Sequence, residues 1–214
     1  MLKIFGRRNA YNVQKVLWTV AEIDLPYEHV DIGSVAGDLD TPDFLALNPH
    51  ARIPVLVDGE TTVWESNTIV RYLCARYAEG SLWPLSAAER SLADRWMDWE
   101  LATLQPDFLD LFWGFYRTPA AQRNMQAIQA SRSRCARHFQ KLDAHLQHNA
   151  YLAGDVFTMA DIACAVSLYR YFAMGLEVPR PANVVAWYER LLQRPAYQAH
   201  IAVPFVELKG RQEF

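Results

Sequence analysis

The chain is poor in cysteine, has no excess of basic residues and contains no long uninterrupted hydrophobic run. Its three cysteines are odd in number and widely spaced along 214 residues, which argues against a disulfide framework and a zinc site. The formal net charge of -3 gives no support to nucleic-acid binding. No segment approaches the apolar length of a membrane span, and the first residues lack the apolar run of a signal peptide. We therefore expect a cytoplasmic protein without nucleic-acid or membrane partners.

What is present is the composition of an ordered globular protein, with 51% hydrophobic and 13% aromatic residues. The length allows one large domain or two small ones. Strand and helix signals alternate over residues 1–79, and no convincing strand signal follows the linker after them. We predict an α/β domain over residues 1–79 with the order β-α-β-α-β-β-α, and an all-α domain over residues 86–214.

Turn and cap signals place the element boundaries. Asp58-Gly59, between two short apolar runs, predicts a β-hairpin. Pro106 should kink or interrupt the long helix that begins at Ser86, because it removes a backbone donor. Tyr27 to Ile32 reads as a strand and Gly33 to Asp40 as a loop. Helix starts are predicted at Thr41-Pro42, Ser66, Ser86 and Thr158, and further helices over residues 119–147, 162–171, 183–193 and after Pro195.

The most informative segment runs from Asn48 to Ser66. Pro54 heads an apolar strand, where it cannot donate to the ladder and restrains Ile53 to an extended conformation. Ile53 is therefore expected to present its N–H and C=O to a peptide-like ligand. Glu65-Ser66 adds an acceptor, a hydroxyl and the N–H groups of a helix N-terminus, which favours a carboxylate. Together these features suit a short peptide with free carboxylates and an amine.

These motifs make the whole chain similar to cytosolic glutathione S-transferases of the bacterial, theta-like or beta-like kind. The resemblance implies a thioredoxin-like N-terminal domain followed by an all-helical C-terminal domain. Each motif alone is weak, but the four occur in the right order and spacing. They are Gly6–Asn9 running into Asn12–Val16, Arg52-Ile53-Pro54, Trp64–Asn67 and the cap at Thr158–Asp161.

The resemblance implies which residues hold glutathione, the co-substrate. It implies a cis peptide bond at Ile53-Pro54, with the Ile53 backbone pairing with the cysteinyl unit. Glu65 would accept from the γ-glutamyl ammonium, and Ser66 would donate to the neighbouring carboxylate. Arg52 and His50 lie where such enzymes often contact the glycine end. The residue types agree, since Arg offers fixed donors to a carboxylate and Glu an acceptor to an amine.

The position that activates the thiol departs from the family pattern. Similar loops tend to have Ser where this chain has Ala10, so no hydroxyl is available there. Asn12 is the first substitute, because its amide can donate near the expected helix N-terminus, and Tyr11 is the second. The backbone N–H groups of residues 10–12 are a third source of hydrogen-bond donors for the glutathione sulfur. The loop also lacks the Cys of the thiol-transferase branch.

The acceptor pocket is assigned by the same resemblance to the aromatic segment after Pro106. Phe108, Phe112 and Tyr116 share one helix face and are expected to form its wall, with Tyr171 closing it from the central helix. An apolar pocket would accept aromatic or alkyl electrophiles. The same stripe is also the ordinary signature of a helix packed in the core.

The resemblance implies a homodimeric glutathione S-transferase that transfers the thiolate to a small hydrophobic electrophile, with no metal. Two alternatives remain open: a non-catalytic binding or regulatory protein of the same fold, favoured by Ala10, and a glutathione-dependent peroxide or disulfide reductase. Lys15 is expected to be structural or a surface charge. His145 and His148 lack a third ligand and are expected to be solvated.

Overall fold

The computed structural model describes residues 1–34 and 37–212. Within them one four-stranded sheet has the order β2-β1-β3-β4. β1 pairs in parallel with β2 and antiparallel with β3, and β3 and β4 form the predicted hairpin. The strands are β1 (Leu2–Phe5), β2 (Tyr27–Val30), β3 (Val55–Asp58) and β4 (Thr61–Trp64).

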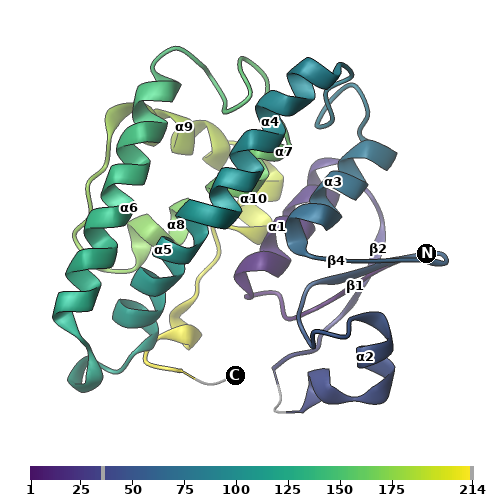
Figure 1. Ribbon diagram of the computed structural model, residues 1–214, viewed down its shortest axis with the longest axis horizontal. Coiled ribbons are helices and arrows are strands. Elements are labelled where there is room, and N and C mark those ends of the chain that lie inside the picture. Colours follow the sequence, from purple (N-terminus) through teal and green to yellow (C-terminus); the bar gives the residue numbers. More distant parts are fainter. Residues whose placement is uncertain (35–36, 213–214) are drawn as a thin grey trace.

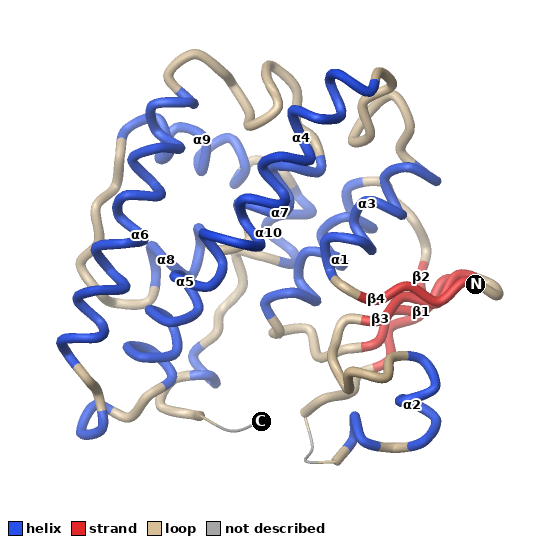
Figure 2. Tube along the Cα trace, viewed as in Figure 1, coloured by secondary structure: helices blue, strands red, loops and turns tan. Residues whose placement is uncertain are grey.

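Helices cover both faces of the sheet. α1 (Tyr11–Glu22) and α3 (Ser66–Tyr77) lie on the face toward the rest of the chain, and α2 (Pro42–Leu47) lies on the other face (Figures 1 and 2). Val13 and Val16 of α1 are fully buried, in agreement with the helical spacing of the apolar positions. The Thr41 hydroxyl caps α2 by accepting from the Phe44 N–H at 3.4 Å.

From residue 87 onward the described chain is helical, which confirms the predicted α/β plus all-α class. A three-residue 3₁₀ turn occurs at 38–40, 120–122 and 206–208. The helices are α4 (Ala87–Trp99), a π-helical segment (Glu100–Leu104), α5 (Gln105–Leu111), a second π-helical segment (Phe112–Arg117), α6 (Met125–Leu146), α7 (Met159–Ala165), α8 (Leu168–Ala173), α9 (Ala182–Leu192) and α10 (Pro195–His200).

Several boundaries differ from the sequence-based prediction. The helix predicted from Pro119 begins at Met125, because the Asn124 side chain accepts from the Ala127 N–H at 3.0 Å and caps it there. The helix predicted over residues 162–171 is two helices, α7 and α8. β2 ends at Val30, and residues 35–36 of the predicted loop lie outside the described part of the chain.

Pro106 interrupts regular α geometry without ending the helical path. The backbone passes through the π-helical segment immediately before it and continues through α5. π turns of this kind often occur at functional sites. Both predicted capping boxes, Ser86 with Glu89 and Thr158 with Asp161, are present.

A polar cluster around a fully buried ion pair joins the sheet domain to the helical domain. Lys15 Nζ of α1 lies 2.8 Å from Glu100 Oε2, and both side chains have no exposed surface. Lys15 also donates to Asn67 Oδ1 of α3 at 3.2 Å and to Gln105 Oε1 at 2.9 Å. Lys15 is therefore structural, and the alternative of a surface charge is wrong.

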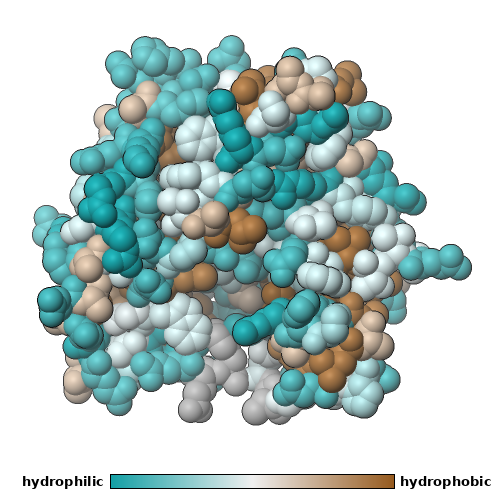
Figure 3. Space-filling model, viewed as in Figure 1, coloured by the Kyte–Doolittle hydropathy of each residue, from teal (hydrophilic) through white to brown (hydrophobic). Residues whose placement is uncertain are grey.

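Hydrophilic side chains cover most of the helical domain in the view of Figure 3, whereas hydrophobic ones gather near α2 and the sheet. The three cysteines are buried and unpaired by disulfides. Burial raises the pKa of the Cys74 and Cys135 thiols to about 12, so these two are packing groups and not thiolates at neutral pH. No helix in the described residues is long and apolar enough to cross a membrane.

Candidate active site

Two adjoining cavities lie beside the start of α1, one between the sheet domain and the helical domain and one within the sheet domain. The larger, about 430 Å³, is lined by the loop before α1 and by residues of α5, the second π-helical segment and α8. The smaller, about 270 Å³, lies at the loop before β3 and the N-terminus of α3. Asn12, Arg52 and Ile53 line both cavities, so one ligand can extend from the smaller into the larger.

The Ile53-Pro54 peptide bond is cis, as the resemblance implies. Strand pairing of β3 begins at Val55, so Ile53 lies beyond the paired ladder, and it lines both cavities. Asn48 was not expected from the sequence as a site residue. Its buried Nδ2 donates to the Arg52 carbonyl at 2.9 Å, so it holds the loop that presents Ile53.

Glu65 and Ser66 lie at the N-terminus of α3, at the edge of the smaller cavity. The N-cap is Glu65, whereas the sequence placed Ser66 there. Glu65 has a φ of 68°, an uncommon conformation for a residue with a side chain. This geometry leaves the Glu65 carboxylate exposed and buries Ser66 as the first helical residue. The cavity thus meets a carboxylate, a hydroxyl and helix N–H groups together.

The two residues predicted for the glycine end have different positions. Arg52 lines both cavities from the loop before Pro54. His50 is exposed and packs edge-to-face on Trp64, with ring centroids 5.1 Å apart. Among the described residues that line the two cavities, His50 does not occur.

Ala10 and Asn12 mark the N-terminus of α1, where both cavities meet. Ala10 is the N-cap and provides no side-chain capping bond. Asn12 Oδ1 is buried without a hydrogen-bond partner among the described residues. Rotation of the amide exchanges its oxygen and its donating nitrogen, so the side chain can offer either atom to a ligand. A buried polar atom of this kind requires a partner, and a bound ligand would supply one.

Tyr11 has a hydroxyl that is already engaged. It donates to Glu100 Oε1 at 3.0 Å, although the ring lines the larger cavity. Burial, followed by the charge of Glu100, raises the pKa of the Tyr11 phenol well above its usual value. Donation to a ligand sulfur would require the loss of the bond to Glu100, which is buried and charge-assisted.

Of the four aromatic residues predicted for the acceptor pocket, only Phe112 is among those that line the larger cavity. Phe108, Phe112 and Tyr116 do share a face, with consecutive rings 5.8 and 5.2 Å apart, but this face turns into the core. Tyr171 is fully buried against Phe139, with ring centroids 4.3 Å apart. The stripe is therefore mainly core, and the neighbouring positions Leu109 and Trp113 line the cavity.

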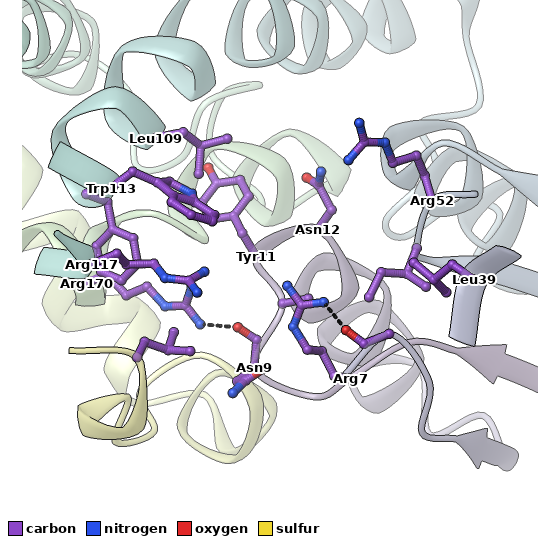
Figure 4. Close-up of a pocket in the computed structure, with 15 residues that line it drawn as sticks. Arg7, Asn9, Tyr11, Asn12, Leu39, Arg52, Leu109, Trp113, Arg117 and Arg170 are labelled. Carbon is purple, nitrogen blue, oxygen red and sulfur yellow. Dashed lines mark hydrogen bonds between the residues drawn. The ribbon is translucent and has the colours of Figure 1, made fainter. Parts of the chain in front are cut away.

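Arginines are the main polar feature of the larger cavity, and all of them except Arg52 were not expected from the sequence as site residues. Arg7 and Arg52 reach it from the sheet domain, and Arg117 and Arg170 from the helical domain (Figure 4). Arg170 donates to the Asn9 carbonyl at 2.7 Å, and Arg7 to the Gly33 carbonyl at 2.8 Å. The four arginines come from segments far apart in the chain, so no local motif indicates that they share one cavity.

Comparison with known proteins agrees with this geometry. The family model for the glutathione S-transferase N-terminal domain matches residues 1–75, and that for the C-terminal domain matches residues 104–195. Glutathione S-transferase GstB of Escherichia coli is 42% identical over 207 residues, which are 95% of this chain and 99% of that relative. Glutathione S-transferase 3 of Zea mays is 34% identical over 94% of this chain and 93% of its own.

A solved structure of similar shape is the theta class glutathione S-transferase of Xanthomonas axonopodis pv. citri with glutathione bound. It matches with a TM-score of 0.91 and 43% identity, covering 95% of this chain and 98% of that one. A thioredoxin-like domain joined to a helical domain, with a cleft between them, defines this class of two-domain enzymes. The chain belongs to the glutathione S-transferase family.

Proposed function

We propose that the chain binds glutathione in the smaller cavity and transfers its thiolate to a small electrophile in the larger one. One observation supports this proposal best. Ile53, the helix N-terminus at Glu65–Ser66 and Asn12 all lie around the two adjoining cavities. Ile53 pairs with the cysteinyl backbone. Glu65 accepts from the γ-glutamyl ammonium, and Ser66 donates to the neighbouring carboxylate.

Arg52 is the contact for the glycine carboxylate, supported by its place in both cavities. His50, which does not line either cavity, is the second candidate for contact with the same carboxylate. Pro54, which lines the smaller cavity, supports the Ile53 edge and makes no polar contact of its own. The sulfur then lies near Asn12, facing the larger cavity, where Phe112 contributes to the acceptor wall.

Asn12 is the proposed thiol-activating residue. A free thiol of this kind has a pKa of about 8.5, so little thiolate exists at neutral pH. Lowering that pKa by one or two units requires about 1.4 to 2.7 kcal/mol, which one amide donor and the positive end of α1 can supply. Tyr11 is the second candidate, weakened by its bond to Glu100. Catalysis is then chiefly proximity and electrostatic stabilisation of the thiolate.

Calorimetric titration with glutathione, followed by a pH titration of thiolate absorbance in the complex, tests this function. Asn12→Ala should keep glutathione binding and return the thiol pKa toward its free value. Gln126→Ala, an exposed amide of α6, is the matched control and should change neither quantity. If the parent protein binds glutathione but the thiol pKa does not shift, the non-catalytic binding protein is favoured. If the parent protein does not bind glutathione, both the transferase and the reductase are contradicted. Turnover with peroxide or disulfide in place of an electrophile would favour the reductase.

We propose two domains, residues 1–79 and 86–214, in a cytoplasmic homodimer with a detoxifying role. The dimer is supported by exposed hydrophobic side chains in both domains, Trp64, Leu92 and Leu101, which are 37%, 36% and 41% exposed. Sedimentation equilibrium of the parent protein and of Leu101→Glu tests it, since a charge in a dimer interface should shift the equilibrium to monomers.

A further inference from the structure

We propose that Asn48 is a positioning residue whose side-chain amide directs the Ile53 N–H toward the cysteinyl carbonyl of glutathione. This inference rests on the proposed glutathione binding and assigns a further residue of the same site. Asn48 is 2% exposed and lines the smaller cavity together with Ile53. The polar atoms of a buried amide require partners, and both partners of this amide lie in the loop that leads to Ile53.

The Asn48 side chain closes the loop over residues 48–52. Its Nδ2 donates to the Arg52 carbonyl at 2.9 Å, and its Oδ1 accepts from the His50 N–H at 3.0 Å. Turning the amide over would place its oxygen against the carbonyl and its nitrogen against the N–H, so the two bonds fix a single orientation. The Asn48 backbone takes part as well, because its carbonyl accepts from the Ala51 N–H at 3.1 Å.

This loop has a backbone conformation that needs support. Ala51 has a φ of 50°, in the left-handed region that a residue with a Cβ rarely adopts. Such a backbone keeps its shape only where surrounding contacts hold it. The two bonds of Asn48 are contacts of this kind, and so is the packing of His50 on Trp64 of β4. Loss of the Asn48 amide should therefore let the loop relax.

The bond to the Arg52 carbonyl acts on the next residue through the peptide plane. The Arg52 carbonyl and the Ile53 N–H belong to one planar trans unit, in which they point in opposite directions. Because Asn48 fixes the carbonyl, it also fixes the direction of the Ile53 N–H. That N–H has no hydrogen-bond partner among the described residues. Since Ile53 lines both cavities, the carbonyl of a bound peptide can supply the partner.

The Ile53 side chain is held by other contacts. A Cβ at Gly6 would lie 3.2 Å from Ile53 Cβ, and one at Gly33 would lie 3.1 Å from Ile53 Cδ1. The two glycines thus allow a close approach that holds this side chain in place. Rotation of the peptide plane between Arg52 and Ile53 is not restrained by these contacts, and the bond from Asn48 restrains it.

Two ligands isolate the proposed contact. γ-Glutamylcysteinamide and γ-glutamylcysteamine share the γ-glutamyl group and the thiol, but only the first has a cysteinyl carbonyl. Neither has the glycine carboxylate, so the Arg52 side chain does not enter the comparison. Titration calorimetry without an electrophile measures the affinity for each ligand. The parent protein should bind γ-glutamylcysteinamide about three- to tenfold more tightly, the effect of one hydrogen bond.

Asn48→Ala should reduce this affinity ratio to about one. Asn149→Ala is the matched control and should leave the ratio unchanged. Asn149 Nδ2 also donates to a carbonyl four residues away, that of His145, at 2.9 Å, but Asn149 does not line either cavity. Arg52→Gln should weaken the binding of glutathione and leave the ratio of the two probes unchanged, because the carbonyl of residue 52 is kept.

Asn48→Asp adds a readout that a general loss of structure would not produce. A protonated carboxyl has the shape of the amide and can donate to the Arg52 carbonyl, whereas a carboxylate cannot. Burial raises the pKa of such a carboxyl, so the donor is present at about pH 4.5 and is lost toward about pH 7.5. The affinity ratio of this variant should fall over that range, while the ratio of the parent protein stays constant.

Urea unfolding of each variant shows whether it is folded before calorimetry. An unchanged ratio in folded Asn48→Ala would overturn the proposal even if both affinities fell, because equal losses indicate only a general distortion. If Asn48→Ala does not fold, Asn48→Asp decides. Failure of that variant to recover the ratio at about pH 4.5 would overturn the proposal as well.

The same titrations separate this inference from the proposed function. A parent protein that binds neither glutathione nor the probes would overturn both. A parent protein that binds glutathione but does not distinguish the two probes would overturn the role of Asn48 alone. The expected ratios without turnover of any electrophile would support the role of Asn48 and contradict the transferase.

Discussion

Lys15 Nζ and Glu100 Oε2 lie 2.8 Å apart with both side chains fully buried, and they join α1 to the first π-helical segment. Glu100 Oε1 accepts from the Tyr11 hydroxyl at 3.0 Å, and Asn67 Nδ2 donates to the Met97 carbonyl at 3.0 Å. The pair therefore fixes the start of α1 against the helical domain. Asn12 lies one residue from Tyr11, so the same contact sets the geometry of the proposed thiol site.

Removal of one member of this pair should be strongly destabilising. Lys15→Met or Glu100→Gln should lower the free energy of unfolding by about 3–5 kcal/mol, because each leaves a buried charge without its counterion. Urea unfolding followed by tryptophan fluorescence measures this. The double variant should lose less free energy of unfolding than the two single variants lose together, since it leaves no unpaired charge.

The control for the buried pair is the exposed pair of Lys3 and Glu28, whose charged atoms lie 3.1 Å apart. Lys3→Met should change the free energy of unfolding by less than about 1 kcal/mol, because water screens such pairs. If single variants of the buried pair lower the free energy of unfolding no more than Lys3→Met does, the cluster does not hold the domains together.

Restoring a hydroxyl at residue 10 should strengthen thiol activation. Ala10→Ser places a donor at the N-cap of α1, where both cavities meet, and a shift of the bound thiol pKa by about one unit would raise the thiolate fraction at pH 7 by roughly eightfold. Thiolate absorbance of the glutathione complex against pH measures the shift. Ala120→Ser, the same change at an exposed distant position, should have no effect. An unchanged thiol pKa in Ala10→Ser would place the sulfur away from the start of α1.

The backbone conformation of Glu65 should separate stability from binding. Both Glu65→Ala and Glu65→Gly remove the acceptor for the ammonium and should weaken glutathione binding by about tenfold or more. Because φ is 68° here, the glycine variant should have a free energy of unfolding about 1 kcal/mol higher than the alanine variant. Calorimetry and urea unfolding measure the two effects. Glu60→Ala, at the exposed hairpin turn, is the control, and an affinity loss as large there would contradict a specific role for Glu65.

His145 should contribute to the pH dependence of stability. It is partly buried, not solvated as the sequence suggested: its ring lies 4.8 Å from that of Trp96, and Nε2 lies 3.0 Å from the Leu152 carbonyl. Burial, followed by the charge of Arg95, lowers its pKa below the ordinary value of 6.5, although the Leu152 carbonyl acts in the opposite direction. The unfolded chain therefore takes up the proton first as the pH falls.

The stabilising effect of neutral His145 is thus present above about pH 6.5 and is lost as the pH falls through its lower folded-state value. The free energy of unfolding of the parent protein should decrease more between pH 7 and pH 5 than that of His145→Gln. His148→Gln, at an exposed position three residues on, is the control. Parallel pH profiles for the parent protein and His145→Gln would contradict the prediction.

Local features of this chain were determined by the sequence alone. The hairpin at Asp58-Gly59 and the capping boxes at Ser86 and Thr158 depend on residues within four positions of one another, and the structure contains all three. The cis bond at Ile53-Pro54, which the resemblance implied, and the helix start at Glu65-Ser66 are also short-range features, and the structure places both at the smaller cavity.

Only the tertiary structure decided which distant side chains meet. Helical spacing left open whether the face of Phe108 and Tyr116 lines a pocket or packs in the core, and the packing of the helical domain around it places this face in the core. Lys15 contacts Glu100, which is 85 positions away in the sequence. Arg7 lines the same cavity as Arg117 and Arg170. Whether a charge is buried, paired or presented to a ligand depends on contacts across the domain boundary, and these form only when the chain is folded.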